Sequence, residues 1–157
     1  MPPGRRRYMK IEGSYKIPAA REIVYKQLLD PEALARALPG CEKLAPNPDG
    51  TYNAEMRVGI AAVKGTYQGR VEILDQKPPE RFRMRVNVRG KGGFLQGEGE
   101  IVLSASGDET TVSYSGETQV GGMIAAVGQR MIQAASRQIV GQFFQAFAKQ
   151  IQERSTH

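Results

Sequence analysis

Tryptophan is absent from this chain of 157 residues, and cysteine and histidine each occur once. The single cysteine, Cys41, excludes an internal disulfide and is typical of a reducing compartment such as the cytoplasm. The single histidine, His157, is the last residue, so residues 1–156 offer no histidine for a general base, a Ser–His triad or a metal site. The sequence therefore argues against hydrolases and histidine-based metalloenzymes.

Long apolar runs are also missing. No stretch approaches the roughly 18–20 apolar residues that span a bilayer, and no apolar signal segment opens the chain. The formal net charge is +6, but three arginines at 5–7 contribute much of it, so the remainder is too small to indicate nucleic-acid binding. We expect one domain over residues 9–153, a disordered leader at 1–8, whether native or added, and a frayed tail at 154–157.

Alternation of apolar and polar residues predicts the secondary structure of most of the chain. Strands are expected at about 10–17, 41–46, 52–58, 63–73, 82–89, 95–103 and 112–120. Two short helices should lie between the first two strands, the second with Asp30 as its N-cap and Pro31 at its first position. One amphipathic helix over about 122–152 ends the chain. The order predicts an α+β fold in which a curved, seven-stranded antiparallel sheet wraps around the long C-terminal helix.

Glycine recurs on the covered face of this predicted sheet. The positions are Gly65, Gly69, Gly97, Gly99 and Gly116. A core that only needs filling favours valine, isoleucine and phenylalanine there, because glycine weakens a strand and packs nothing. The glycines therefore predict sharp curvature, an unfilled cavity, or both.

The other inward positions are mostly apolar, with a few tyrosine hydroxyls. The candidate ligand-binding residues are Tyr52, Met56, Val58, Tyr67, Phe82, Met84, Val86, Leu95, Gly97, Gly99, Tyr114, Met123, Val127 and Met131. Small-molecule sites are concave and mostly apolar, with few polar groups that fix orientation. Methionine adapts to irregular shapes, and a buried tyrosine hydroxyl needs a partner that a quinone carbonyl offers. Each residue alone also fits a plain core, but together with the glycines they predict a hydrophobic-ligand site.

No catalytic or metal site is expected, and no covalently bound cofactor. The carboxylates of Glu98, Glu100 and Glu117 fall on outward positions. Arginines of a neighbouring strand can pair with them there, at positions 83, 85 and 89. Cys41 lacks a histidine partner and is expected to be a half-buried structural thiol.

The layout resembles the helix-grip fold of the START/Bet v 1-like (SRPBCC) superfamily. Within it, several segments resemble CoxG, a family of carbon monoxide dehydrogenase subunits. These are Met9–Pro18 (MKIEGSYKIP), Asp30–Pro31, Leu38–Glu42 (LPGCE), Val63–Tyr67 (VKGTY), Gly90–Gly93 (GKGG) and Gln119–Gly122 (QVGG).

The resemblance implies a cytoplasmic accessory protein of a carbon monoxide dehydrogenase-type molybdenum hydroxylase. It also implies a quinone or other lipid in the cavity, and contact with the inner face of the membrane. Two alternatives remain open from the sequence. One is a recruitment or membrane-tethering module that acts through its surface, and the other is an enzyme of the polyketide cyclase type.

Overall fold

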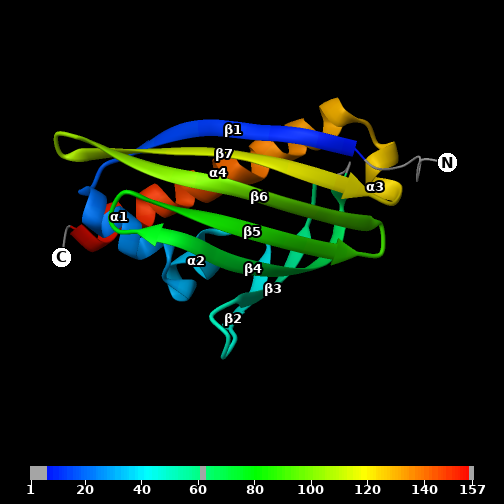
Figure 1. Ribbon diagram of the computed structural model, residues 1–157, viewed down its shortest axis with the longest axis horizontal. Helices are drawn as coiled ribbons and strands as arrows, with labels where there is room; N and C mark the ends of the chain where they lie inside the picture. Colours follow the sequence, from blue (N-terminus) through cyan, green and yellow to red (C-terminus); the bar gives the residue numbers. More distant parts are fainter. Residues whose placement is uncertain (1–6, 61–62, 156–157) are drawn as a thin grey trace.

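A computed structural model describes residues 7–60 and 63–155 of the protein (Figure 1). Seven antiparallel strands form one sheet in the order β1-β7-β6-β5-β4-β3-β2. The strands are β1 (Arg7–Ile17), β2 (Cys41–Pro46), β3 (Tyr52–Val58), β4 (Gly65–Lys77), β5 (Arg81–Gly90), β6 (Gly93–Ser106) and β7 (Glu109–Gly121). The antiparallel α+β fold predicted from the sequence is confirmed.

Four helices accompany the sheet in the described part of the chain. They are α1 (Arg21–Leu28), α2 (Pro31–Ala37), α3 (Met123–Ala126) and α4 (Gln129–Ser155). The start of α2 follows directly from its sequence. The Asp30 carboxylate accepts a hydrogen bond from the Glu32 backbone N–H at 3.0 Å, and Pro31 occupies the first turn.

The long helix α4 closes the concave side of the sheet. It contacts β1 at one edge of the sheet and α2 beside the other edge, while β4 to β7 curve around it (Figure 1). The two edge strands are β1 and β2, and α1 and α2 connect them. The arrangement is the helix-grip fold.

The C-terminal helix is interrupted, so the prediction of one helix over 122–152 is wrong at its start. Gly128 has φ of +106°, a left-handed conformation that ends α3 and lets α4 begin at Gln129. The interruption changes which residues of the following turn face the sheet. Ile132 is 2% exposed, whereas Met131, which an unbroken helix would turn inward, is 53% exposed.

The ends of the domain also differ from the predicted boundaries. Arg7 and Tyr8, assigned to the leader, begin β1 and lie opposite Val120 and Gln119 of β7. The expectation for the rest of the leader, residues 1–6, lies outside the described residues. The helix α4 continues to Ser155, two residues past the predicted end of the domain.

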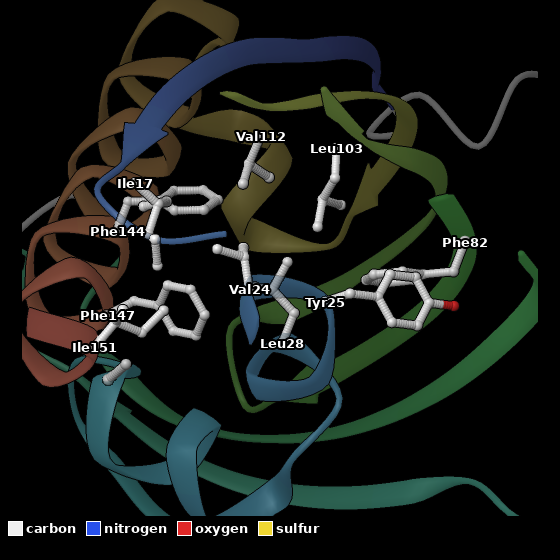
Figure 2. Close-up of a cluster of buried hydrophobic side chains, with 12 residues drawn as sticks. Ile17, Val24, Tyr25, Leu28, Phe82, Leu103, Val112, Phe144, Phe147 and Ile151 are labelled. Atoms are coloured by element: carbon white, nitrogen blue, oxygen red, sulfur yellow. The ribbon is translucent and has the colours of Figure 1, made fainter. Parts of the chain in front are cut away.

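Two separate clusters of buried apolar side chains stabilise the fold. The larger lies where α1 and the C-terminal half of α4 meet the sheet, and includes Ile17, Val24, Leu103 and Phe147 (Figure 2). The smaller consists of Met9, Val120, Ala125 and Ile132 near α3. The inner face of the sheet continues between the two clusters, and this middle section holds the candidate site.

Candidate functional site

Apolar side chains on the middle section of the inner face remain partly accessible. Met84, Val86 and Val88 of β5 are half-buried and belong to neither cluster. Met84 lies opposite Gly99, and Val86 lies opposite Gly97, in the register of β5 with β6. Because these two glycines present no side chain, the methionine and the valine lack an apolar neighbour on that side. The arrangement leaves apolar surface uncovered under α4.

The glycines of β6 and β7 also allow the two strands to approach closely. Gly99 lies opposite Gly116. A Cβ on Gly99 would lie 2.8 Å from the Ser115 carbonyl oxygen, and a Cβ on Gly116 would lie 2.9 Å from that of Glu98. Gly97 is similarly tight, because its Cβ would lie 2.8 Å from a methyl group of Thr118. Close approach and curvature are therefore sufficient reason for glycine at these three positions.

Gly69 of β4 is different. A Cβ there would meet Val88 at 3.6 Å and Ala54 at 3.9 Å, which are ordinary van der Waals distances. Glycine at this position is required neither by the backbone nor by a close neighbour. Gly69 is therefore the inward glycine that best indicates unfilled space.

Two tyrosine hydroxyls offer polar groups beside this surface. Tyr15 of β1 and Tyr114 of β7 stack on Phe144 of α4, with ring centroids 4.6 and 6.1 Å away. Neither hydroxyl has a hydrogen-bond partner among residues 7–60 and 63–155. Burial raises the pKa of Tyr114, and nearby Tyr15 raises this pKa further, while Arg137 lowers it. Both hydroxyls are therefore available as neutral donors.

Most of the predicted strand residues do come together on the inner face. Tyr52, Met56, Val58, Tyr67, Met84, Val86, Leu95, Gly97, Gly99 and Tyr114 share its parity. Tyr67 is satisfied within the protein, because its hydroxyl donates to the Val63 carbonyl at 2.6 Å. Burial raises its pKa. Phe82 is core, 3% exposed and edge-on to Tyr25 (Figure 2).

The residues predicted from the C-terminal helix are placed less well. Met123 and Met131 are 72% and 53% exposed, so their predicted inward orientation is wrong. The break at Gly128 is the physical reason for Met131, while Met123 opens the separate helix α3. Val127 packs against the smaller cluster. Tyr15 was missed, although its alternation with Ile11 and Ile17 signals the inner face.

The outer face of the sheet carries the predicted ladder of charges. Arg83 and Arg85 pair with Glu98 at 3.4 and 3.5 Å, and Arg85 also pairs with Glu72 at 3.0 Å. Arg81 extends the ladder, because it pairs with Glu100 at 3.9 Å. A shallow polar hollow of about 780 Å³ runs over this ladder from β5 to β1. Opposite charges in cross-strand register explain these residues as solvated structural pairs.

Cys41 sits half-buried at the start of β2. Its thiol donates to the Lys43 carbonyl at 3.6 Å, and burial raises its pKa, although the contact with Lys43 opposes this rise. A raised pKa keeps the sulfur in its unreactive thiol form. The geometry fits the structural role expected from the sequence.

Comparison with known proteins supplies the family. The profile of CoxG, a family of carbon monoxide dehydrogenase subunits, matches residues 13–152. The chain belongs to the CoxG family. Among curated proteins none matches this CoxG chain.

Solved structures support the assignment of this CoxG chain. It resembles a conserved protein from Geobacillus kaustophilus with a TM-score of 0.89 and 34% identity, covering 92% of this chain and 96% of the other. A START superfamily protein from Mycobacterium smegmatis has a TM-score of 0.70 at 12% identity, covering 92% and 97%. Norcoclaurine synthase from Thalictrum flavum has a TM-score of 0.68 at 16% identity, covering 96% and 90%. The last two comparisons show the fold alone.

None of the helices in the described part of this CoxG chain combines the length and apolar character needed to cross a bilayer.

Proposed function

We propose that this CoxG-family protein binds a hydrophobic ligand, a quinone or another lipid, between the sheet and α4, without catalysing a reaction. The observation that carries the proposal is the middle section of the inner face. There, Met84, Val86 and Val88 stay accessible between two well-packed clusters. Ligand sites combine apolar walls with a few oriented polar groups, and the hydroxyls of Tyr15 and Tyr114 match the polar part.

The chemistry of the polar groups favours binding over catalysis. The ionisable groups described beside the middle section are tyrosines, and burial raises the pKa of both Tyr67 and Tyr114. A general base needs a pKa near the working pH, and these phenols are shifted away from it. Tyrosine hydroxyls do suit a quinone, whose carbonyl oxygens accept hydrogen bonds.

The family name supports a partner. The CoxG family takes its name from carbon monoxide dehydrogenase, so we propose that this protein serves a molybdenum hydroxylase of this type in the cytoplasm. Affinity purification from the native host, with mass spectrometry of the co-purifying proteins, tests this part. Recovery of the hydroxylase polypeptides is the expected result, and their absence under mild conditions would contradict the association.

Native mass spectrometry of the protein purified from its own host tests the ligand. We expect an additional mass that is released by organic solvent and identified as a quinone or another neutral lipid. A double variant, Tyr15→Phe with Tyr114→Phe, is the matched control, because it removes two hydroxyls and keeps the aromatic stack on Phe144. We expect it to carry less ligand than the wild type. Wild-type protein that leaves its host without any lipid, and takes up none when offered, would refute the proposal.

A second candidate function, membrane tethering, is favoured by the surface around α3. Met123 and Met131 are exposed there, and Arg89, Lys91 and Arg130 are exposed nearby in the chain. The loop between β5 and β6 meets α3 directly, because the Ile124 N–H donates to the Gly92 carbonyl at 2.9 Å. Residues 118–152 contain no aspartate or glutamate. Exposed apolar side chains with lysine and arginine are typical of surfaces that bind anionic lipid.

Sedimentation with vesicles tests the tether. We expect binding to vesicles that contain phosphatidylglycerol, weaker binding to pure phosphatidylcholine, and loss of binding on combining Met123→Ser with Met131→Ser. Ile23→Ser is the control, because Ile23 is also exposed but lies on α1. Equal sedimentation of all three proteins would contradict the tether and leave ligand binding untouched.

A further inference from the structure

We infer that the ligand enters through the seam between α4 and the end of β3, and that this entrance selects an uncharged, hydrogen-bonding head group. The inference rests on the proposed function and deepens it. A hollow of about 510 Å³ lies at this seam. Its lining joins Val58 and Ile139 to the more polar Arg57, Gln138 and Gln142.

The sheet topology leaves this seam open. The edge strand β2 pairs with β3 only as far as Cys41 opposite Met56. Beyond that point the outer edge of β3 has no strand beside it, and the Arg57 N–H donates instead to the Gly40 carbonyl at 2.8 Å. The helix α4 passes here with Gln138, Ile139 and Gln142. The other edge of the sheet differs, because β1 contacts α4.

Val58 connects the hollow to the candidate site. It shares the parity of Met56, and it lies opposite Gly65 on β4. Met56 in turn lies opposite Tyr67 on the same inner face. An alkyl chain that enters beside Val58 and Ile139 therefore continues along apolar surface toward the middle section.

The charge at the entrance is balanced. Arg57 is the charged residue in the lining of the hollow, and its guanidinium lies 3.7 Å from the Glu42 carboxylate. The remaining polar side chains are the carboxamides of Gln138 and Gln142, which donate and accept hydrogen bonds without charge. A fatty-acid carboxylate would have to compete with Glu42 for Arg57. A quinone carbonyl or an alcohol finds amide donors free of such competition.

This assignment gives a role to the Leu38–Glu42 segment. Pro39 and Gly40 form part of the lining, and the Gly40 carbonyl fixes the backbone of Arg57. Glu42 then neutralises the side chain of Arg57. The segment thereby sets both the shape and the charge of the entrance.

Exchange kinetics test the location of the entrance. The fluorescent probe is phenylnaphthylamine, a neutral compound that brightens in apolar surroundings, and stopped-flow mixing gives its association and release rates. Gln142→Trp places bulk at the rim, whereas Gln145→Trp makes the same change on α4 outside the lining. We expect Gln142→Trp to slow association and release alike, by about threefold or more, at unchanged affinity.

Equal rates in the two tryptophan variants would overturn the entrance while leaving ligand binding intact. Failure of the wild type to bind the probe, dodecanol or a short-chain quinone would overturn the proposed function together with the entrance. Melting temperatures within a degree or so of each other show that both variants are folded.

Head-group selectivity tests the charge argument. We expect the wild type to bind dodecanol more tightly than dodecanoate. Glu42→Gln exposes the charge of Arg57 and should shift this preference toward dodecanoate by about twofold to fivefold. Glu32→Gln is the matched control, because Glu32 and Arg36 on α2 also form an exposed pair at 3.7 Å, outside the lining. An unchanged preference in Glu42→Gln, or the same shift in both variants, would overturn the inference.

Discussion

Tyr15 and Tyr114 show how single residues combine packing with polarity inside this protein. Each ring stacks on Phe144, so both side chains are held in place without a hydrogen bond to their hydroxyls. A free hydroxyl beside accessible apolar surface costs the empty protein little and is ready for a ligand. The affinity for a carbonyl-bearing ligand should therefore depend on these two oxygens.

The first prediction concerns Tyr114→Phe. We expect the affinity for a quinone to fall by about 0.5–1.5 kcal/mol, the usual contribution of one hydrogen bond, while the melting temperature stays nearly constant. Isothermal titration with decylubiquinone measures the change. Tyr67→Phe is the control, because the Tyr67 hydroxyl already donates to Val63 and should affect stability more than affinity. A Tyr114→Phe protein that binds as tightly as the wild type would exclude this hydroxyl from the site.

The second prediction concerns alkaline pH. Burial, and secondarily Tyr15, raise the pKa of Tyr114 in the folded protein. The folded state therefore resists deprotonation, and the corresponding stability is complete below the unfolded pKa of about 10 and is lost as pH rises through the higher folded value. The melting temperature should fall less steeply above pH 10 in Tyr114→Phe than in the wild type. Parallel curves would show that Tyr114 does not contribute to this decline.

At the scale of single elements, β6 and β7 show why glycine cannot be interpreted by one rule. The alternation in the sequence places five glycines on the inner face correctly, but it does not distinguish close approach of strands from open space. That distinction depends on cross-strand register, since Gly99 faces Gly116 whereas Gly69 faces Ala54. Register is a tertiary property that a single strand does not specify.

The third prediction separates these two kinds of glycine. Gly99→Ala should lower the free energy of unfolding by about 1–3 kcal/mol, because its Cβ would press on the Ser115 carbonyl. Gly69→Ala should be neutral or stabilise by up to about 1 kcal/mol, because the site has room. Urea unfolding measures both. Equal losses in the two variants would contradict the assignment of space around Gly69.

The fourth prediction concerns the break between α3 and α4. Alanine at Gly128 has room but must adopt a left-handed conformation, so Gly128→Ala should cost about 1–2 kcal/mol. Gly59→Ala also has room and needs no such conformation, and should be near neutral. Thermal unfolding compares the two. A Gly128→Ala protein of full stability would show that α3 and α4 join into one helix without penalty.

For the molecule as a whole, the sequence contained the fold but only part of the site. Period-2 alternation, the Asp30–Pro31 cap and the amphipathic C-terminal segment predicted the strands, the short helices and the helix grip, because these signals are local. The orientation of Met123 and Met131 depended on one glycine, and the entrance depends on where β2 ends beside β3. Both arise from packing between distant segments, which local patterns do not specify.

The most direct test of the central claim measures ligand uptake and stability together in the wild type and in Gly69→Leu. Leucine at this position projects from an uncrowded glycine into the interior, so it should displace ligand without forcing strands apart. The account predicts that the wild type takes up decylubiquinone, and that Gly69→Leu takes up at least about tenfold less at an unchanged or higher melting temperature, which corresponds to a loss of about 1.4 kcal/mol of binding free energy. A wild type that binds nothing, combined with a Gly69→Leu protein that loses several degrees of melting temperature, would show a solid core and contradict the account.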